Sequence, residues 1–466
     1  MKTDKNSLDK FLDNYRKIQR VLLIKSPTLN YETLDVEAHK HSGYMTYPPI
    51  EITTLAATLR EKLPDIDLKL YDAEYETLVS LRKGEKLENI LENKIKDELE
   101  RFKPDLVGIS VSFSVAKANG LKILNFVKNY EKKILTVFGG VHATFDSEHL
   151  IDKGADMVFL READNTFTDF IRYAKDRKEF NSGVNGFVYK LDGEIKKIEY
   201  VAQPKFEDLP MPAWDMIDTA NYYKISPLGI LKNEIGISEP TAIIQTLRGC
   251  VAKCTFCSVR NFNGFGVRTR KVKDVVDEIE LFVNKYGVKY IEVVDDDFTA
   301  DVPRAIKICK EIIKRKLDVI WSLDNGIRLG TITEELAENL VAAKCRMISV
   351  GVESGNKEIY VVNDKLGTPT YTHDFSKNVK LLIENKQRGL FNMVCGGLTG
   401  RYEVCKELVR LLGLEGIVNI EEVSSDYFAT EYFSKRPPSE RLINKRLDDL
   451  GLNFMRDWKV SLKGIS

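Results

Sequence analysis

Three cysteines fall within eight positions of the chain, in the segment RGCVAKCTFC that spans residues 248–257. The CxxxCxxC spacing allows three thiolates to converge on one small inorganic core, but it cannot saturate that core. Structural zinc requires four protein ligands, and no fourth Cys or His follows at a normal ligand spacing. A 4Fe–4S cluster held by Cys250, Cys254 and Cys257 would keep one iron free to bind and reduce a substrate. The motif therefore favours such a cluster over zinc or an unliganded trio of thiols.

The composition limits the classes of protein to be considered. The chain has 466 residues, 43% hydrophobic and 30% charged, which is a globular composition and suggests about three domains. The 70 Lys and Arg residues balance the 70 Asp and Glu residues, which excludes a broad electrostatic field aimed at nucleic acid or at an anionic membrane. No apolar run approaches the ~20 residues that a transmembrane helix needs. Because the N-terminus lacks a signal-peptide pattern, we expect a cytoplasmic protein. The charge balance and the absence of a long apolar run lead us to expect no membrane or nucleic-acid partner, with specific binding through a local charged patch left open.

The elements that must position the cysteines follow from the hydrophobic pattern. Residues 1–20 predict a short amphipathic helix docked on the body, and residues 21–180 alternate apolar strands with amphipathic helices. This alternation predicts an α/β domain with a doubly wound parallel sheet, in which ligands bind beyond the carboxyl ends of the strands. The predicted strands are 21–24, 68–71, 106–110, 134–138 and 157–160, and the helices between them include 52–62 and 87–102.

A hairpin and a linker, residues 181–237, separate this domain from a second α/β region. Residues 187–191 and 194–201 flank Asp192-Gly193, which is a hairpin signal, and prolines then mark an extended linker. From 238 to 430 the alternation restarts with six β/α units, which predicts a partial TIM-type barrel with its chemistry at the carboxyl ends of the strands. Its predicted strands are 242–246, 290–295, 319–324, 347–352, 391–395 and 420–427, and a charged segment, 431–466, ends the chain.

The cysteine loop follows the first strand of this barrel, and three further segments follow later strands. Asp295-Asp296-Asp297 follows the second strand, Gly351-Val352-Glu353-Ser354-Gly355 the fourth, and Gly396-Gly397-Leu398-Thr399-Gly400 the fifth. In this order the region resembles the radical S-adenosylmethionine (SAM) superfamily. Thr399 and Arg401 depart from the proline and glutamate of that family. The resemblance implies that SAM is bound by Asp295, Asp296, Asp297, Glu353 and Ser354. Outside this context, a triple aspartate is usually a solvated cap or a magnesium site.

The first domain resembles the cobalamin-binding module that is fused to many radical SAM enzymes. The matching residues are Pro48-Pro49 before the first helix, the serines after the third strand (Ser110, Ser112 and Ser114), and the segment 138–144. Gly139 and Gly140 would allow the backbone to approach the buried nucleotide tail of the cofactor closely. The serines would offer hydroxyls to the tail, and His142 would pack near the same loop.

Many cobalamin proteins supply a histidine below the cobalt through a D-x-H-x-x-G motif. The strand end that we compare with this motif reads Asp72-Ala73-Glu74-Tyr75-Glu76 and carries no histidine. We therefore expect cobalamin to bind with its own base displaced and with no histidine on the cobalt. His39 and His41 precede the first helix and are open candidates for the cofactor face, but a lone histidine is more often structural.

The two resemblances together imply a cobalamin-dependent radical SAM enzyme with a 4Fe–4S cluster, SAM and cobalamin as cofactors. The reaction that they imply is methylation of an unactivated carbon of a small metabolite or a peptide side chain, with two SAM molecules per turnover. A flavodoxin or ferredoxin is the expected reductant. The alternatives are a cyclisation, ring contraction or oxidation without methyl transfer and, from another class, a corrinoid and electron carrier. A carrier has no use for SAM-binding loops such as 295–299 and 351–355.

Overall fold

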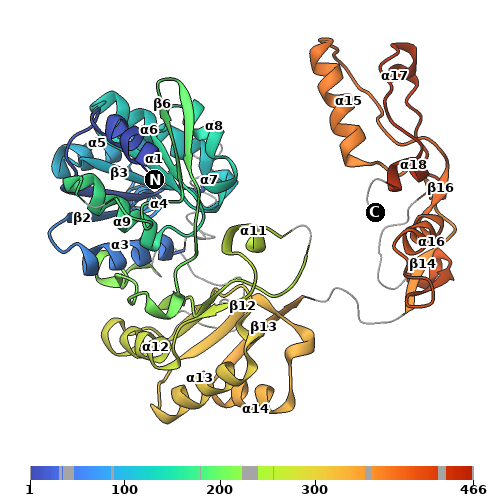
Figure 1. Cartoon of the computed structure of the whole chain (residues 1–466). Coiled ribbons are helices and arrows are strands. Elements are labelled where there is room, and N and C mark those ends of the chain that lie inside the picture. The colour runs from blue at the N-terminus through green and yellow to red at the C-terminus, as the bar shows by residue number, and fades with distance from the viewer. Residues whose placement is uncertain are drawn as a thin grey trace. The chain divides into compact units, whose positions relative to one another are not determined.

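The computed structural model describes residues 2–30, 34, 47–85, 89–178, 180–222, 240–254, 257–351, 358–428 and 437–463. The chain divides into two compact units, Met1–Gly351 and Val352–Ser466. Two sheets with their covering helices make up most of the first unit (Figure 1). In the described part of the chain, none of the helices combines the length and apolar character needed to cross a membrane.

The larger sheet of the first unit has seven described strands in the order β2-β1-β3-β4-β5-β6-β7. The first five of these run parallel, which confirms the predicted doubly wound sheet, and their 2-1-3-4-5 order is the flavodoxin-like one. β6 and β7 form the predicted hairpin and extend the same sheet with antiparallel pairing. The strands are β1 (Arg20–Lys25), β2 (Asp67–Asp72), β3 (Leu106–Ser110), β4 (Leu135–Gly139), β5 (Met157–Phe159), β6 (Phe187–Leu191) and β7 (Glu194–Ile198).

Helices cover both faces of this sheet because its central strands are apolar on both sides. One face packs against α1 (Lys2–Leu12), α3 (Ile50–Lys62) and α9 (Asp164–Asp176) through side chains such as Phe11, Leu59 and Phe170. The other face packs against α5 (Ile90–Phe102) and α6 (Lys117–Tyr130). α1, in the region where residues 1–20 were expected to form a docked helix, spans Lys2–Leu12 and packs through Leu8, Phe11 and Leu12. The shorter helices are α4 (Ala73–Arg82), α7 (Val141–Phe145) and α8 (Ser147–Asp152).

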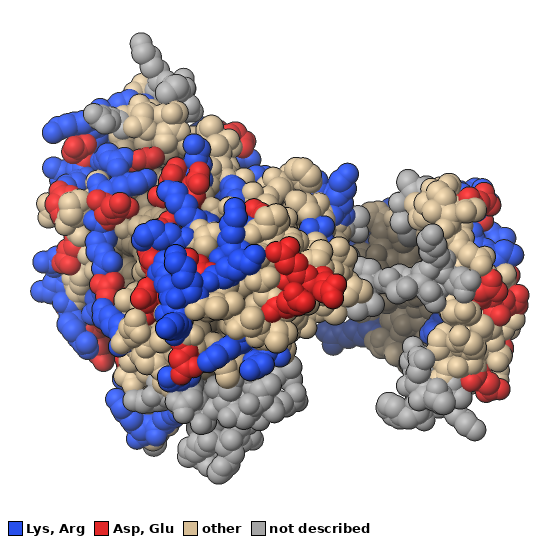
Figure 2. Space-filling model, turned by 90° about the horizontal axis from the view of Figure 1, so that it is seen from below, with Lys and Arg blue, Asp and Glu red and all other residues tan. Residues whose placement is uncertain are grey.

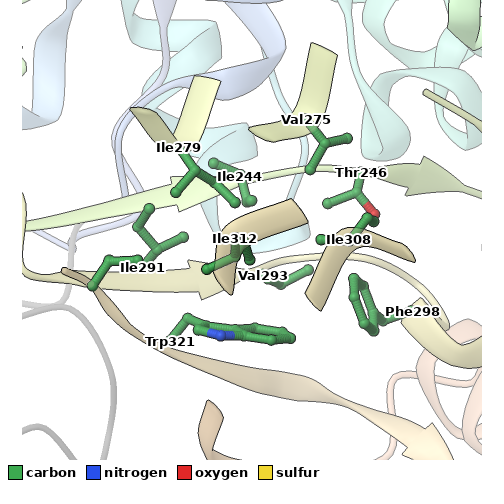
Figure 3. A pocket seen from close by; sticks show the side chains of 11 residues that line it. Ile244, Thr246, Val275, Ile279, Ile291, Val293, Phe298, Ile308, Ile312 and Trp321 are labelled. Atoms are coloured by element: carbon green, nitrogen blue, oxygen red, sulfur yellow. The ribbon is translucent and has the colours of Figure 1, made fainter. Parts of the chain in front are cut away.

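The smaller sheet has four parallel strands in the order β13-β12-β11-β8. They are β8 (Thr241–Ile244), β11 (Tyr290–Val293), β12 (Ile320–Arg328) and β13 (Cys345–Gly351), and they correspond to the first four predicted barrel strands. One face packs against α12 (Val272–Tyr286), α13 (Val302–Lys314) and α14 (Glu334–Ala342). Figure 3 shows a small pocket in this layer, where Ile279 and Ile312 from the helices point toward Ile291 and Trp321 from the strands. Because its lining is apolar apart from Thr246, this pocket is part of the packed core.

The last two predicted barrel strands do not join this sheet. Residues 391–395 form no strand, because the Val394 backbone bonds to the Asn444 side chain and Gly396 pairs with Asp457 of the C-terminal segment. The predicted strand at 420–427 is shorter, β17 (Asn419–Val423), and pairs with β14 (Glu358–Val362) within the second unit. That unit also contains β15 (Leu366–Gly367), β16 (Thr399–Gly400), α15 (Thr372–Glu384), α16 (Arg401–Leu411), α17 (Lys445–Asp449) and α18 (Trp458–Leu462).

Charges of both signs are present on one face of the first unit. Figure 2, seen from below Figure 1, shows Lys and Arg side chains interspersed with Asp and Glu side chains on this face. Many charged side chains of the first unit pair locally, as Arg315 does with Asp277 at 2.7 Å and with Glu280 at 2.8 Å. The face therefore offers the mixed surface that the balanced composition predicts.

Candidate functional site

The cysteine loop begins directly after a short ribbon, in which β9 (Leu247–Arg248) pairs antiparallel with β10 (Arg268–Thr269). Gly249, the next residue, has φ +94°, and a Cβ at this position would lie 2.3 Å from the carbonyl oxygen of Gly266. Only glycine can make this turn and this close approach. α11 (Val259–Asn263) follows the loop. The ribbon and the glycine therefore fix the point at which the chain enters the CxxxCxxC segment.

The three cysteines are half-buried and form no disulfide, and their donor chemistry fits an iron–sulfur cluster. The Ala252 N–H points at Cys250 Sγ at 3.4 Å, and burial raises the pKa of the Cys250 thiol. Such a thiol loses its proton when it coordinates a metal. Within the described residues, however, no three Cys, His, Asp or Glu side chains are grouped closely enough to hold one metal ion. The structure thus places the thiols on one loop without converging them, and their role as ligands stays a prediction.

Two of the three aspartates after β11 hold the backbone that leads into the cysteine loop. Asp295 accepts hydrogen bonds from the Thr246 N–H at 2.5 Å, from the Leu247 N–H at 3.0 Å and from the Thr246 hydroxyl. Asp296 accepts from the Gly249 N–H at 2.7 Å and from Asn263 Nδ2 at 2.9 Å. Burial raises the pKa of Asp295 to about 6 in spite of these donors. Both carboxylates therefore position the loop, and their predicted contact with SAM stays a prediction.

The other predicted SAM residues have different surroundings. Asp297 is buried and accepts hydrogen bonds from Arg328 Nε at 2.6 Å and from the Thr299 hydroxyl at 3.1 Å. Glu353 and Ser354 lie outside the described residues. The glycine-rich segment 396–400 belongs to the second unit, where its last two residues form β16.

The carboxyl ends of β3 and β4 border open space on the larger sheet. A Cβ added at Gly139 would meet no atom within 4 Å, whereas one added at Gly140, with φ +105°, would lie 2.7 Å from the carbonyl oxygen of Val111. Large apolar side chains beside these strand ends stand in solvent, since Phe113 is 64% and Phe145 53% exposed. Exposed apolar groups around an open glycine are typical of a ligand site. The residues present therefore fit a bulky organic cofactor such as cobalamin.

The predicted serines and histidine of this site are only partly grouped. Ser114 Oγ lies 3.0 Å from His142 Nδ1, and His142 Nε2 lies 3.3 Å from an Asp146 carboxylate oxygen. Ser110 instead donates to Glu51 of α3 at 3.3 Å. Ser112 is half-buried on the same loop. Contact of any of these side chains with the nucleotide tail stays a prediction.

The segment that we compare with the D-x-H-x-x-G motif opens α4. Asp72 accepts the N–H groups of Glu74 and Tyr75 at 3.0 Å, and its second oxygen accepts the Tyr222 hydroxyl at 2.8 Å. Its carboxylate therefore serves as a helix cap. His39 and His41 lie outside the described residues, so the expectation of a cobalt without histidine stays a prediction.

Sequence reasoning missed a polar face on the smaller sheet, opposite its helices. Glu292 is 2% exposed and accepts the Tyr47 hydroxyl at 3.4 Å, while its other carboxylate oxygen has no hydrogen-bond partner among the described residues. Burial and the nearby charge of Asp324 raise the pKa of Glu292 to about 7. Polar residues alternate with apolar ones along this strand, as in Tyr290-Ile291-Glu292. This period of two was the available signal for a face turned into a barrel.

Two protein-family models match the chain, one for each region. The model of the Radical SAM superfamily matches residues 244–412, and the model of the B12 binding domain matches residues 41–171. An "Uncharacterized methyltransferase PH0819" of Pyrococcus horikoshii is 27% identical over 372 residues, 78% of this chain and 72% of that protein. The "Anaerobic magnesium-protoporphyrin IX monomethyl ester cyclase" of Rubrivivax gelatinosus is 27% identical over 306 residues, 64% of this chain and 52% of that protein.

A solved structure supports the same fold. The cobalamin-dependent SAM radical enzyme OxsB, with aqua-cobalamin and SAM bound, superposes with a TM-score of 0.52 and 18% sequence identity over 87% of this chain. The chain covers 49% of OxsB, about half its length, as it does for the cyclase. The chain therefore combines a B12 binding domain with a region of the Radical SAM superfamily. Its cofactors are accordingly a 4Fe–4S cluster, SAM and cobalamin.

Proposed function

We propose that the protein is a methyltransferase that acts on an unactivated carbon of a small metabolite or a peptide side chain. The observation that carries the proposal is that the open glycine site of the larger sheet and the cysteine loop of the smaller sheet belong to one compact unit. A relative named as a methyltransferase aligns with more of the chain, 78%, than the relative named as a cyclase, 64%.

The proposed reaction is R–H + 2 SAM + 2 e⁻ → R–CH₃ + S-adenosylhomocysteine + methionine + 5′-deoxyadenosine. The bound cofactors supply the methyl group and the 5′-deoxyadenosyl radical. A flavodoxin or ferredoxin would deliver the two electrons. The chain contributes placement: Gly139 leaves room for the nucleotide tail, and Asp295 and Asp296 fix the backbone that precedes the cysteines. Placement of this kind is a large part of what a protein adds to cofactor chemistry.

Product analysis tests this proposal directly. The reduced holoenzyme would be given methyl-deuterated SAM together with candidate metabolites and peptides, and the products would be identified by mass spectrometry. We expect S-adenosylhomocysteine and 5′-deoxyadenosine in equal amounts, with the labelled methyl group on substrate carbon. If a candidate compound stimulates 5′-deoxyadenosine formation and no such compound acquires the labelled methyl group, the proposal is contradicted.

A second candidate function is cyclisation or oxidation without methyl transfer, which the similarity to the cyclase of Rubrivivax gelatinosus favours. This reaction consumes one SAM per radical and leaves no S-adenosylhomocysteine. Formation of 5′-deoxyadenosine alone, in the presence of a substrate that is converted, would therefore select this candidate.

A further inference from the structure

Two carboxylates and two guanidinium groups form a buried network next to the cysteine loop. Arg248 Nη1 donates to a Glu162 carboxylate oxygen at 2.9 Å and to Asp164 at 2.8 Å. Arg268 Nη1 donates to Glu162 at 2.9 Å, and its Nη2 also pairs with that carboxylate. Glu162 and Asp164 are each 5% exposed. Two negative and two positive charges balance, so the network is neutral as a whole.

The network joins two parts of the chain that differ in their cofactors. Glu162 lies just beyond β5 of the larger sheet, and Asp164 is the first residue of α9. Arg248 lies two residues before Cys250 and stands opposite Arg268 in the β9–β10 ribbon. Both carboxylates therefore come from the cobalamin-binding half of the unit, the region matched by the B12 binding model (residues 41–171). Both arginines come from the β9–β10 ribbon, which precedes and follows the cysteine loop.

Further contacts hold Arg248 in a single orientation. Its Nε donates to Gln245 Oε1 at 3.0 Å, and its guanidinium lies 4.6 Å from the centre of the Phe206 ring. A planar guanidinium that stacks on a ring and bonds two carboxylates cannot be replaced by an ammonium group with the same geometry. Removing one partner of a buried ion pair leaves the other charge uncompensated. The position of Arg248 therefore depends on Glu162 and Asp164.

The same carboxylate is connected to the glycine turn of the larger sheet. The backbone N–H of Arg161, the residue before Glu162, donates to the Thr144 hydroxyl at 2.8 Å. That hydroxyl in turn donates to the carbonyl oxygen of Gly140 at 3.0 Å. Hydrogen bonds and steps of one or two residues along the chain therefore connect Gly140, through Glu162 and Arg248, to Cys250.

We propose that Glu162 is a positioning residue for the iron–sulfur cluster, acting from the cobalamin-binding half through Arg248. It sets the position of the loop that carries Cys250, and it makes this position responsive to what occupies the space beside Gly139. The inference rests on the predicted ligation by Cys250 and does not depend on methyl transfer.

The test compares the holoenzyme with Glu162→Gln, which keeps the size of the side chain but removes its charge. Iron content, the electron paramagnetic resonance spectrum of the reduced cluster with SAM, and that spectrum with and without cobalamin are measured. We expect full iron content, an altered spectrum with SAM, and loss of the spectral change that cobalamin causes in the wild type. SAM cleavage to 5′-deoxyadenosine should fall about tenfold or more, the effect of one lost charge-assisted contact.

Asp374→Asn is the matched control, because Asp374 is an equally buried carboxylate that pairs with Arg456 at 2.9 Å in the second unit. It should lower the unfolding temperature and leave the cluster spectrum unchanged. If Glu162→Gln does not yield folded protein, Arg248→Lys is measured in the same way, because it keeps the charge and loses the planar fork. Wild-type spectra in either folded variant, or a wild-type cluster that does not respond to cobalamin, would overturn the proposal. Because these spectra need no methyl acceptor, a failed methyltransferase assay would leave this result standing.

Discussion

The two sheets of the first unit end differently on the side where their cofactors are expected. β3 and β4 lead into glycines and exposed apolar side chains and leave space beside Gly139. β11 leads into aspartates whose oxygens already accept backbone N–H groups of the next segment. A large preformed cofactor requires room, whereas a cluster bound by side chains of one loop requires that the loop be held. The end of the larger sheet therefore suits its cofactor because it leaves space free. The end of the smaller sheet suits its cofactor because hydrogen bonds fix the loop that carries the cysteines.

The largest effect should come from removing the three predicted cluster ligands of the cysteine loop. A variant with Cys250, Cys254 and Cys257 all changed to Ala should bind no 4Fe–4S cluster and form no 5′-deoxyadenosine, because no thiolate remains for the iron. It should still bind cobalamin and methylate it after chemical reduction, giving S-adenosylhomocysteine. Iron analysis, Mössbauer spectroscopy and mass spectrometry measure these outcomes. A wild-type protein that binds zinc tightly in place of iron would contradict the assignment.

The second prediction concerns a substitution that fills the open space beside Gly139, at the carboxyl end of β4. Gly139→Leu should weaken cobalamin binding about 100-fold or more, since its side chain would enter the space that the cofactor needs, and the unfolding temperature should stay unchanged. Gly140→Ala should instead destabilise the fold by about 1–3 kcal/mol, because of its positive φ and the nearby Val111 carbonyl oxygen. Cobalamin titration and thermal unfolding of both variants measure this contrast. Equal stability losses at the two positions would show that Gly139 does not face open space.

The buried face of the smaller sheet should make stability depend on pH. The pKa of Glu292 is about 7 in the folded protein against an ordinary value of 4.5, so the folded state holds more protons between these values. The stabilisation from this group is then fully present below about pH 4.5 and is lost as pH rises to about 7, by at most ~3.4 kcal/mol at 1.36 kcal/mol per pKa unit. Glu292→Gln should gain stability relative to the wild type as pH rises from 5 to 8. Unfolding midpoints measured across this range, with a constant difference between the two proteins, would refute the shift.

A smaller effect should follow from weakening the hydrogen bond between the Gly249 N–H and Asp296, which positions the cysteine loop. Asp296→Asn keeps an oxygen for the Gly249 N–H but loses the charge that strengthens the bond, which amounts to about 1 kcal/mol. We expect 5′-deoxyadenosine formation to slow about fivefold with no loss of iron. Asp301→Asn, which changes the cap of α13 on the same connection, should leave this rate unchanged. A slower rate in both variants would indicate a general loss of stability.

Hydrophobic periodicity predicted most of the fold. The strands from 21 to 160, the hairpin at Asp192-Gly193 and the first four barrel strands all appear within a few residues of their predicted bounds. The sixth predicted strand forms as β17 but pairs with β14 in the second unit, whereas the fifth does not form, for a reason that periodicity cannot detect. Residues 391–395 are apolar enough for a strand, but the Val394 backbone bonds to the Asn444 side chain, and Gly396, the residue after the segment, pairs with Asp457. Such distant side-chain partners leave no local pattern in the sequence.

The sequence motifs indicated the candidate site but did not indicate the residues that support it. The CxxxCxxC loop and Gly139-Gly140 stand out because few other structures need those residues at that spacing. Glu162 and Asp164 did not, since a carboxylate after a strand is usually a solvated residue or a cap. Their importance comes from pairing with arginines 84 to 106 positions later in the chain. Long-range charge pairing of this kind becomes visible only in three dimensions.

The β6–β7 hairpin also affects how the molecule meets other copies of itself. β7 is an edge strand of the larger sheet, and it carries Lys196 and Lys197 in succession, so one ammonium group points to each side of the strand. Each pairs with a nearby glutamate, Lys196 with Glu194 at 2.5 Å and Lys197 with Glu199 at 2.9 Å. A second chain that added a strand here would have to dehydrate these charges. The hairpin therefore disfavours edge-to-edge aggregation at this border of the sheet.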